Sequence, residues 1–160
     1  MNYANIFFDD TVNGEGFRTS LFVSGCSKKP PCKECWSPDA RNFNYGHIFT
    51  NDTKDSILDS LKNPYVMGLS ILGGEPMDNL EDGILLDLVR TVNKLYPGKT
   101  IFCWTGYTFE ELIKDPMRLE FIICLDMLRD GEYIPELRSV TQYLNGSTNQ
   151  RIINVKERLL

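Results

Sequence analysis

The chain has 160 residues, which favours one domain with a core of ordinary size. Its 17 Lys and Arg residues against 22 Asp and Glu residues give a net charge of −5, so the basic footprint of a duplex-binding protein is missing and we expect no nucleic-acid partner. Hydrophobic residues make up 42% and charged residues 24%, a globular composition that excludes a disordered chain.

The distribution of apolar residues and cysteines indicates where the protein works. No run approaches the roughly 18 consecutive apolar residues of a membrane span, and the start, MNYANIFFDD, lacks a basic region ahead of an apolar stretch. We therefore expect no membrane partner and a cytoplasmic location. Five cysteines, three of them within ten positions, favour a metal or catalytic cluster in a reducing compartment over a disulfide framework.

The first half of the chain, after an irregular start, predicts two strands, a long loop and a helix. Residues 19–23 (TSLFV) form a β-branched and aromatic run that ends at a Ser-Gly turn, which predicts a strand. Residues 26–51 are rich in Pro, Asn, Lys and Gly, which predicts an ordered loop of the length that is usually functional. Apolar residues on one helical face predict a helix over 52–63, and residues 66–72 (VMGLSIL) predict a buried strand.

The second half begins with the strongest helical pattern in the chain. Apolar residues three and four apart predict a helix over 80–95, which Pro-Gly then stops. Residues 100–104 (TIFCW) predict a strand, and Thr108 with Glu111 three residues later forms a capping box that predicts the start of a helix. Residues 121–125 (FIICL) predict a further buried strand.

Apolar strands separated by amphipathic helices are typical of a parallel sheet covered by helices. The last thirty residues predict only one short strand, 152–155. A complete eight-unit barrel needs roughly 200 residues or more, so this chain is too short for one. We therefore expect an α/β fold with one domain over residues 1–160, an incomplete (β/α) barrel of about five or six units with a mainly parallel sheet.

Three of the predicted strands are followed by residues that carry chemistry. The loops begin at Gly25, Gly73 and Trp104, and the first of them leads directly into Cys26. Ligands of parallel sheets bind at the carboxyl ends of the strands. We therefore expect these three loops to meet at one edge of the sheet and to form the site.

Cys26, Cys32 and Cys35 form a C-x5-C-x2-C pattern on the first loop. Soft thiolates at close spacing select zinc, copper(I) or an iron–sulfur cluster. Structural zinc sites and four-iron clusters normally have four protein ligands, whereas this loop supplies three. The fourth position is then open to another residue, a water or an exogenous ligand.

Three further side chains are candidates for that fourth position. Cys103 and Cys124 lie within predicted strands, where cysteine usually behaves as a small buried apolar residue. His47, the single histidine, would complete a zinc site, although a lone histidine in a loop is more often an exposed polar residue without a metal.

Gly73-Gly74-Glu75-Pro76 follows a predicted strand, where glycines permit a ligand to approach the backbone closely. Backbone carbonyls and the Glu75 carboxylate are suitable acceptors for the ammonium group of an amino acid. Taken alone, this segment also fits an ordinary tight turn.

Five blocks in order across most of the chain resemble the radical S-adenosylmethionine superfamily, and within it the activating proteins of anaerobic ribonucleoside-triphosphate reductases. The blocks are VNGEGFR (12–18), LFVSGC (21–26), GGEP (73–76), WTGY (104–107) and GSTNQR (146–151). The first cysteine gap is five residues here, whereas the superfamily usually has three, and the two additional residues can bulge outward without moving the sulfurs.

The resemblance implies two cofactors, one 4Fe-4S cluster per chain and S-adenosylmethionine. Cys26, Cys32 and Cys35 would each bind one iron, and the amino and carboxylate groups of S-adenosylmethionine would chelate the fourth. The protein would orient the cofactors and exclude water, so no side chain is assigned a catalytic acid or base role.

The resemblance also implies the contacts of S-adenosylmethionine. Gly73, Gly74 and Glu75 would hold the methionine amino group. Glu34 stands before the third cysteine, where the superfamily often has an aromatic residue, so Trp36 is expected to share the packing on the adenine side.

The implied activity is that of an activase. Reductive cleavage of S-adenosylmethionine would release a 5′-deoxyadenosyl radical, which would take a hydrogen atom from a glycine of the reductase's catalytic subunit and leave a glycyl radical. Lys28, Lys29 and Lys33 form a small basic patch that either docks an acidic flavodoxin-like electron donor or is simply a solvated loop.

Two alternatives stay open at this point. Another small radical enzyme, such as 7-carboxy-7-deazaguanine synthase, shares a GGEP-like turn but usually has Asp where this chain has Trp36. A zinc-binding interaction domain would use the three cysteines and His47, but it leaves the glycine turn and the 146–151 block unexplained.

Four other side chains near predicted strand ends allow two interpretations each. Trp104 and Tyr107 would line the adenine or the incoming glycine segment, or pack in the core. Asp126 and Asp130 would face the ligand edge, or belong to an ordinary turn.

Overall fold

The computed structural model describes residues 1–159, which form one seven-stranded sheet with helices against it. The strands are β1 (Asn2–Asp10), β2 (Phe17–Ser24), β3 (His47–Ile48), β4 (Val66–Gly73), β5 (Thr100–Trp104), β6 (Met127–Asp130) and β7 (Arg151–Asn154). The α-helices are α1 (Asn51–Leu61), α2 (Ile84–Leu95), α3 (Phe109–Leu112), α4 (Pro116–Ile122) and α5 (Val155–Arg158). Short 3-10 turns are η1 (Asp39–Arg41), η2 (Pro76–Asp78) and η3 (Pro135–Leu137).

The strand order is β3-β1-β2-β4-β5-β6-β7, so the sheet is open and ends at β3 and β7. The central strands β2, β4, β5 and β6 are parallel, as the sequence predicts, whereas β1, β3 and β7 pair antiparallel. The expected α/β class and parallel centre are therefore confirmed. The expected five or six parallel units are not found in this sheet, because its outer strands run the other way, and a barrel form stays a prediction.

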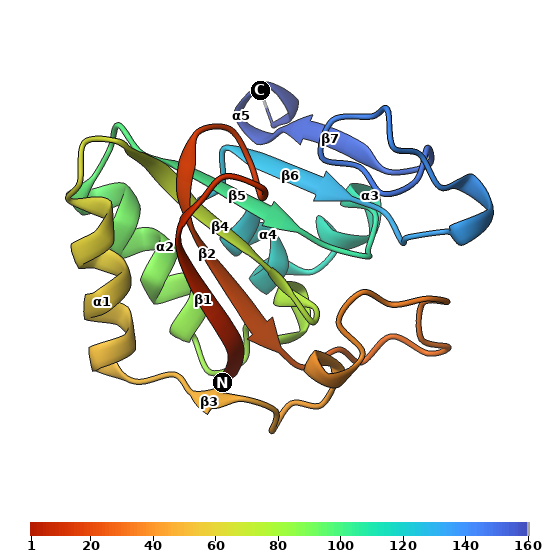
Figure 1. The fold of residues 1–160 in the computed structure, drawn as a ribbon, viewed down its shortest axis with the longest axis horizontal. Helices are drawn as coiled ribbons and strands as arrows, with labels where there is room; N and C mark the ends of the chain where they lie inside the picture. Colours follow the sequence, from red (N-terminus) through yellow and green to blue (C-terminus); the bar gives the residue numbers. More distant parts are fainter. Residues whose placement is uncertain (160) are drawn as a thin grey trace.

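Helices α1, α2 and α4 lie on one face of the sheet (Figure 1). The side chain of Thr50 caps α1, and the central part of the apolar stripe of α2 is buried because it packs on the strands. The core residues of that stripe are Leu85, Leu88, Val89 and Val92. This packing fixes the strands and directs their carboxyl ends, with the loops that follow them, to one end of the molecule (Figure 1).

The two faces of the central sheet differ in what they present. Because side chains alternate along a strand, Ile71 of β4 and Cys103 of β5 point into the helix-covered core. The opposite face carries Phe22 in register with Leu72, and Trp104 in register with Arg129. This second face provides the floor of the site described below.

The prediction of a strand over 121–125 is wrong, because that segment belongs to the end of α4 and the turn after it. The Asp115 side chain accepts hydrogen bonds from two backbone N–H groups of the first turn, and Pro116 occupies the first helical position. The apolar residues then face the core at helical spacing. The strand follows as β6, and Cys124 consequently lies at a helix end with partial exposure.

The start of the chain, expected to be irregular, is the nine-residue strand β1. The pairing of β1 with β2 contains register shifts, and the consecutive Phe7 and Phe8 are both half exposed. The alternation of apolar and polar residues that marks a strand in the sequence is therefore absent. The predicted last strand is displaced by one residue, since Val155 begins α5. Within residues 1–159, no helix is long and apolar enough to cross a membrane.

Candidate functional site

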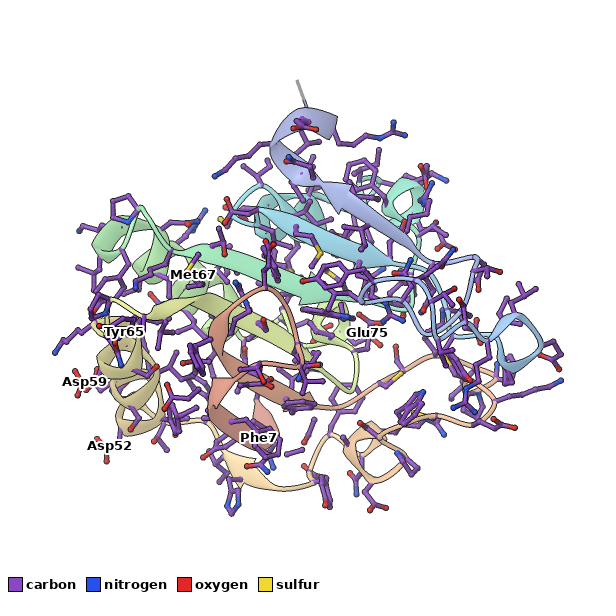
Figure 2. All side chains as sticks on the ribbon, turned by 45° about the horizontal axis from the view of Figure 1, so that its top comes forward. Phe7, Asp52, Asp59, Tyr65, Met67 and Glu75 are labelled. Carbon is purple, nitrogen blue, oxygen red and sulfur yellow. The ribbon has the colours of Figure 1, made fainter. Side chains whose placement is uncertain are left out.

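A cavity of about 550 Å³ lies at the carboxyl ends of the parallel strands, where the three predicted loops meet. Figure 2 shows Glu75 at this end of β4, whereas Tyr65 and Met67 mark the other end of the same strand. Eight residues of the predicted site line the cavity: Cys26, Cys32, Cys35, Trp36, Gly73, Gly74, Glu75 and Trp104. The convergence that the sequence predicts is therefore present in the fold.

The three thiols of the first loop are free and half-buried, and all of them line this cavity. Within residues 1–159, no three side chains of the ligating types already stand in an arrangement that holds a metal ion. Residues 26–38 contain no helix or strand, so their backbone can close around a metal centre without breaking a regular element. The donor set, three soft thiols facing one cavity, fits an iron–sulfur cluster with one iron free for a ligand.

Burial raises the pKa of the Cys26 thiol, and burial together with the nearby Glu132 carboxylate raises the pKa of Cys32 to about 11. Both thiols are therefore protonated in the metal-free protein at neutral pH. Because iron binds the thiolate, loading of the site has to release these protons.

Asp78, which the sequence did not single out, holds the start of the cysteine loop. Its Oδ2 accepts hydrogen bonds from the backbone N–H and the hydroxyl of Ser27, both at 2.7 Å. Its Oδ1 accepts from the Tyr107 hydroxyl at 2.9 Å and pairs with Arg118 at 3.3 Å. One nearly buried carboxylate thus ties the loop after β2 to the loop after β5.

The lysines of the predicted basic patch differ in their surroundings. Lys28 donates to the Gly106 carbonyl at 2.5 Å and lies 3.5 Å from a carboxylate oxygen of Glu132. Lys33 pairs with Glu136 at 3.3 Å on the surface, and Lys29 is exposed. Two of the three charges are thus partly balanced by acidic residues of the segment that follows β6.

The glycine turn after β4 is packed backbone against backbone. Gly73 has a φ of +109°, in the region that favours glycine, and a Cβ on Gly74 would lie 2.5 Å from the Gly25 carbonyl oxygen and 2.6 Å from that of Ala40. The Gly74 N–H donates to Val23 and the Glu75 N–H donates to Gly25, at 2.8 and 2.7 Å. Glycine is therefore required here for close approach of three chain segments.

The Glu75 carboxylate is buried and already occupied. It accepts from the Met77 N–H at 3.1 Å, the Thr105 hydroxyl at 2.7 Å and the Gly106 N–H at 2.8 Å. Burial nevertheless raises its pKa to about 7. The side chain thus joins the loops after β4 and β5, and the backbone is the better candidate for an ammonium group, since the Gly74 carbonyl accepts no hydrogen bond within residues 1–159.

Two predicted residues lie outside the cavity. Glu34 is exposed with a φ of 51° and is absent from the cavity wall, so the structure does not support its predicted cofactor contact, whereas Trp36 lies at the rim and is 77% exposed. His47 is exposed on the edge strand β3, with its ring 5.6 Å from that of Tyr3. It does not join the cysteines, which contradicts the zinc-binding alternative. Cys103 is buried in the core, as predicted.

The acidic and aromatic residues after β5 and near β6 have mostly structural partners. Trp104 lines the cavity, whereas Tyr107 binds Asp78 outside it. Asp126 accepts from the Ile101 N–H, and the buried Asp130 accepts from the Phe109 N–H and pairs with Arg151. These aspartates therefore support the fold and do not face the cavity.

Sequence reasoning missed several polar residues of the cavity wall, among them Arg41, Arg129 and Asn145. Arg129 stands between the apolar Met127-Leu128 pair and Asp130 in β6, and no sequence pattern distinguishes it from an ordinary polar residue at a strand end. Arg41 ends the short turn η1 and Asn145 lies in a loop, and neither segment has a distinguishing pattern.

Comparison with known proteins supports the chemistry of this site. A family model described as a 4Fe-4S single cluster domain matches residues 12–153. Proteins named anaerobic ribonucleoside-triphosphate reductase-activating protein are similar over nearly their whole length. The one from Haemophilus influenzae is 35% identical over 98% of this chain and 99% of its own length. The one from Vibrio cholerae is 38% identical over 95% and 97%, and that of Enterobacteria phage T4 is 36% identical over 95% and 93%.

No solved structure matches the chain. The curated relatives favour the activating proteins over the synthase and interaction-domain alternatives, and the matched family model agrees with the three thiols of the cavity. The chain therefore belongs to the family of anaerobic ribonucleoside-triphosphate reductase-activating proteins and contains a 4Fe-4S single cluster domain.

Proposed function

We propose that this chain generates a glycyl radical on the catalytic subunit of an anaerobic ribonucleoside-triphosphate reductase, with S-adenosylmethionine as the radical source. When bound and reduced, the cluster would supply the electron for cleavage of the sulfonium, and this cleavage would provide the radical chemistry that removes a hydrogen atom from the glycine. The observation that carries the proposal is that the three thiols and the glycine turn line one cavity.

Different residues of the cavity would bind the cluster and S-adenosylmethionine. Cys26, Cys32 and Cys35 would supply three thiolates, which leaves one iron for the amino acid half of S-adenosylmethionine. The Gly74 carbonyl, which accepts from no donor in the part of the chain that the structure describes, would accept from the ammonium group. Glu75 would act indirectly, since its carboxylate holds the turn against Thr105 and Gly106.

The floor of the cavity is suited to an oxygen-sensitive and water-sensitive reaction. Phe22, Leu72 and Trp104 form an apolar row across β2, β4 and β5. Such a surface excludes water from a radical and leaves the open side of the cavity for the glycine segment of the reductase. This arrangement requires the protein to orient the cofactors, and no side chain has to donate or accept a proton.

The electron donor is proposed to be an acidic, flavodoxin-like protein. Lys29 is exposed on the cysteine loop and Lys33 is only paired at the surface, where water screens the pair. Both charges stay available to an acidic partner that approaches the cluster from outside. Lys28 is excluded from this role because it is held by Gly106 and Glu132.

The proposal is tested with protein reconstituted with iron and sulfide without oxygen. We expect a brown protein with about four irons per chain that, once reduced, converts S-adenosylmethionine to 5′-deoxyadenosine and methionine. When the reductase is added, electron paramagnetic resonance is expected to show a glycyl radical.

Each alternative result identifies a different failure. Cofactor cleavage without a glycyl radical on the reductase would indicate another radical enzyme. A colourless protein that takes up zinc and does not cleave S-adenosylmethionine would contradict the proposal altogether.

A further inference from the structure

Two partly or fully buried arginines lie on the cavity side of the sheet, and they have very different surroundings. Arg18 on β2 is 1% exposed and donates to Ser70 Oγ, Thr100 Oγ1 and two backbone carbonyls, at 2.7 to 2.9 Å. Its guanidinium also lies 3.8 Å from the centre of the Phe102 ring. Every part of this group has a partner, so Arg18 is a structural residue.

Arg129 on β6 lacks such partners. Its Nη2 donates to Gln150 Oε1, its Nε is buried with no hydrogen-bond partner, and it forms no ion pair within residues 1–159. Burial alone lowers its pKa to about 10, without any carboxylate to oppose the shift. The guanidinium lines the cavity beside Trp104, its neighbour in the sheet register.

Gln150 holds this guanidinium in a defined position. The Gln150 side chain is buried, and its Oε1 also accepts from the backbone N–H groups of Gly146 and Ser147, at 2.8 and 3.1 Å. Its Nε2 donates to the Gly131 carbonyl at 2.9 Å. The amide is therefore fixed from three sides, and it fixes the orientation of the Arg129 fork that faces the cavity.

Unpaired polar atoms are concentrated in this cavity. Four buried side-chain nitrogen or oxygen atoms within residues 1–159 lack a hydrogen-bond partner, and three of them belong to cavity-lining residues, Arg41, Arg129 and Asn145. These atoms are themselves closed off from the open cavity, so they show that the side chains of its wall are incompletely paired within the protein. A ligand can reach the part of the Arg129 guanidinium that lines the cavity. The fixed cation in particular requires a negatively charged or strongly accepting partner.

The charges of the proposed ligand restrict that partner to one group. S-adenosylmethionine carries a sulfonium and an ammonium, which a guanidinium repels, and a single carboxylate, which it attracts. We propose, on the basis of the function proposed above, that Arg129 binds the α-carboxylate of S-adenosylmethionine. A carboxylate that contributes one oxygen to a metal still has lone pairs for a guanidinium, so the two contacts are compatible.

The test is equilibrium binding to the cluster-loaded protein without reductant, measured by calorimetry with S-adenosylmethionine and with its decarboxylated analogue. In the Arg129→Met variant we expect the Kd for S-adenosylmethionine to rise about 10- to 100-fold. The Kd for the decarboxylated analogue should change by less than about 2-fold, because the group that Arg129 recognises is missing from it. Arg129→Lys should restore part of the difference, since it keeps the charge but loses the fork.

The matched control is Arg138→Met, which makes the same chemical change at an exposed residue near the cavity segment. It should leave both Kd values unchanged. The melting temperature of the metal-free protein provides a second readout, because removal of an unpaired buried charge should not lower it, whereas Arg18→Met should lower it strongly.

Three results would overturn the inference. Equal affinity of Arg129→Met and Arg138→Met for S-adenosylmethionine would show that Arg129 has no contact with it. An equal loss for both ligands would assign Arg129 to the nucleoside or to the shape of the cavity. A large loss of stability in Arg129→Met would make it a structural residue like Arg18. Failure of the wild-type, cluster-loaded protein to bind S-adenosylmethionine would instead contradict the proposed function itself.

Discussion

The glycine turn after β4 and the cysteine loop after β2 line the same cavity but differ in how closely they are packed. The turn is fixed by backbone hydrogen bonds to Val23 and Gly25 and by contacts so close that only glycine fits. The cysteine loop has no regular structure over residues 26–38 and is held near its start by side chains, through Ser27 and Lys28.

From this difference we expect the two halves of the site to be completed at different times. The turn that would bind the amino acid is already formed in the metal-free protein, because its geometry depends on packing. The thiols share the cavity without forming a metal-binding group within residues 1–159, so the metal itself has to draw them together. Changes in the turn should therefore damage the metal-free protein, whereas changes in the loop should damage metal loading alone.

Replacement of Cys35 by alanine should have the largest effect on activity. With two thiolates left, we expect the four-iron cluster and the formation of 5′-deoxyadenosine to be lost. The melting temperature of the metal-free protein should stay the same, because the loop carries no regular structure. Iron analysis and a cleavage assay measure the result. Cys124→Ala, at a cysteine outside the cavity, is the control and should keep its iron.

Replacement of Gly74 by alanine should break the turn. The new Cβ would collide with two backbone carbonyls, so we expect a loss of about 3 kcal/mol in the free energy of unfolding of the metal-free protein. Urea denaturation measures it. Gly98→Ala, where a Cβ meets no atom within 4 Å, should change stability by less than about 0.5 kcal/mol. Similar stability of the two variants would mean that the turn is not as closely packed as described.

Glu75 should make the stability of the turn depend on pH. Its pKa is raised by burial from 4.5 to about 7, so the folded protein holds this proton more tightly than the unfolded chain does. The protonated Glu75 carboxyl therefore stabilises the folded protein fully below about pH 4.5. This stabilisation, up to about 3 kcal/mol in the free energy of unfolding, is lost as the pH rises to about 7. Urea midpoints between pH 4.5 and 7.5 should fall more steeply in the wild type than in Glu75→Gln. Parallel curves would show that Glu75 does not titrate in this range.

Asp78 connects the two regions, and its replacement should have the smallest effect. Asp78→Asn removes the charge that Arg118 pairs with and weakens the hydrogen bonds from Ser27. We expect a loss of about 1 kcal/mol in the metal-free protein and slower uptake of iron. Asp59→Asn, in an exposed pair with Lys62, is the control and should change neither quantity. Unchanged uptake in Asp78→Asn would show that the loop is not positioned from η2.

Local signals were sufficient for much of the fold. The strand over 100–104 has the predicted bounds, and both halves of the Thr108 and Glu111 capping box are formed. The segment 121–125 was misassigned because its apolar run fits a strand and a helix equally well, and the cap at Asp115 decides between them. The strand β1 was not predicted, because pairing with β2 stabilises it and its sequence has no alternating apolar pattern.

The three clustered thiols, the glycine turn and their position after parallel strands follow from short-range patterns, since a strand end and a cysteine spacing are local properties. Long-range packing settled which side chains reach the cavity. It placed Trp36 at the rim and Glu34 outside, gave the Glu75 carboxylate three donors from its own turn and the next loop, and left Arg129 without a carboxylate. Such partners come from segments up to dozens of residues apart, so their proximity is a consequence of strand order and register.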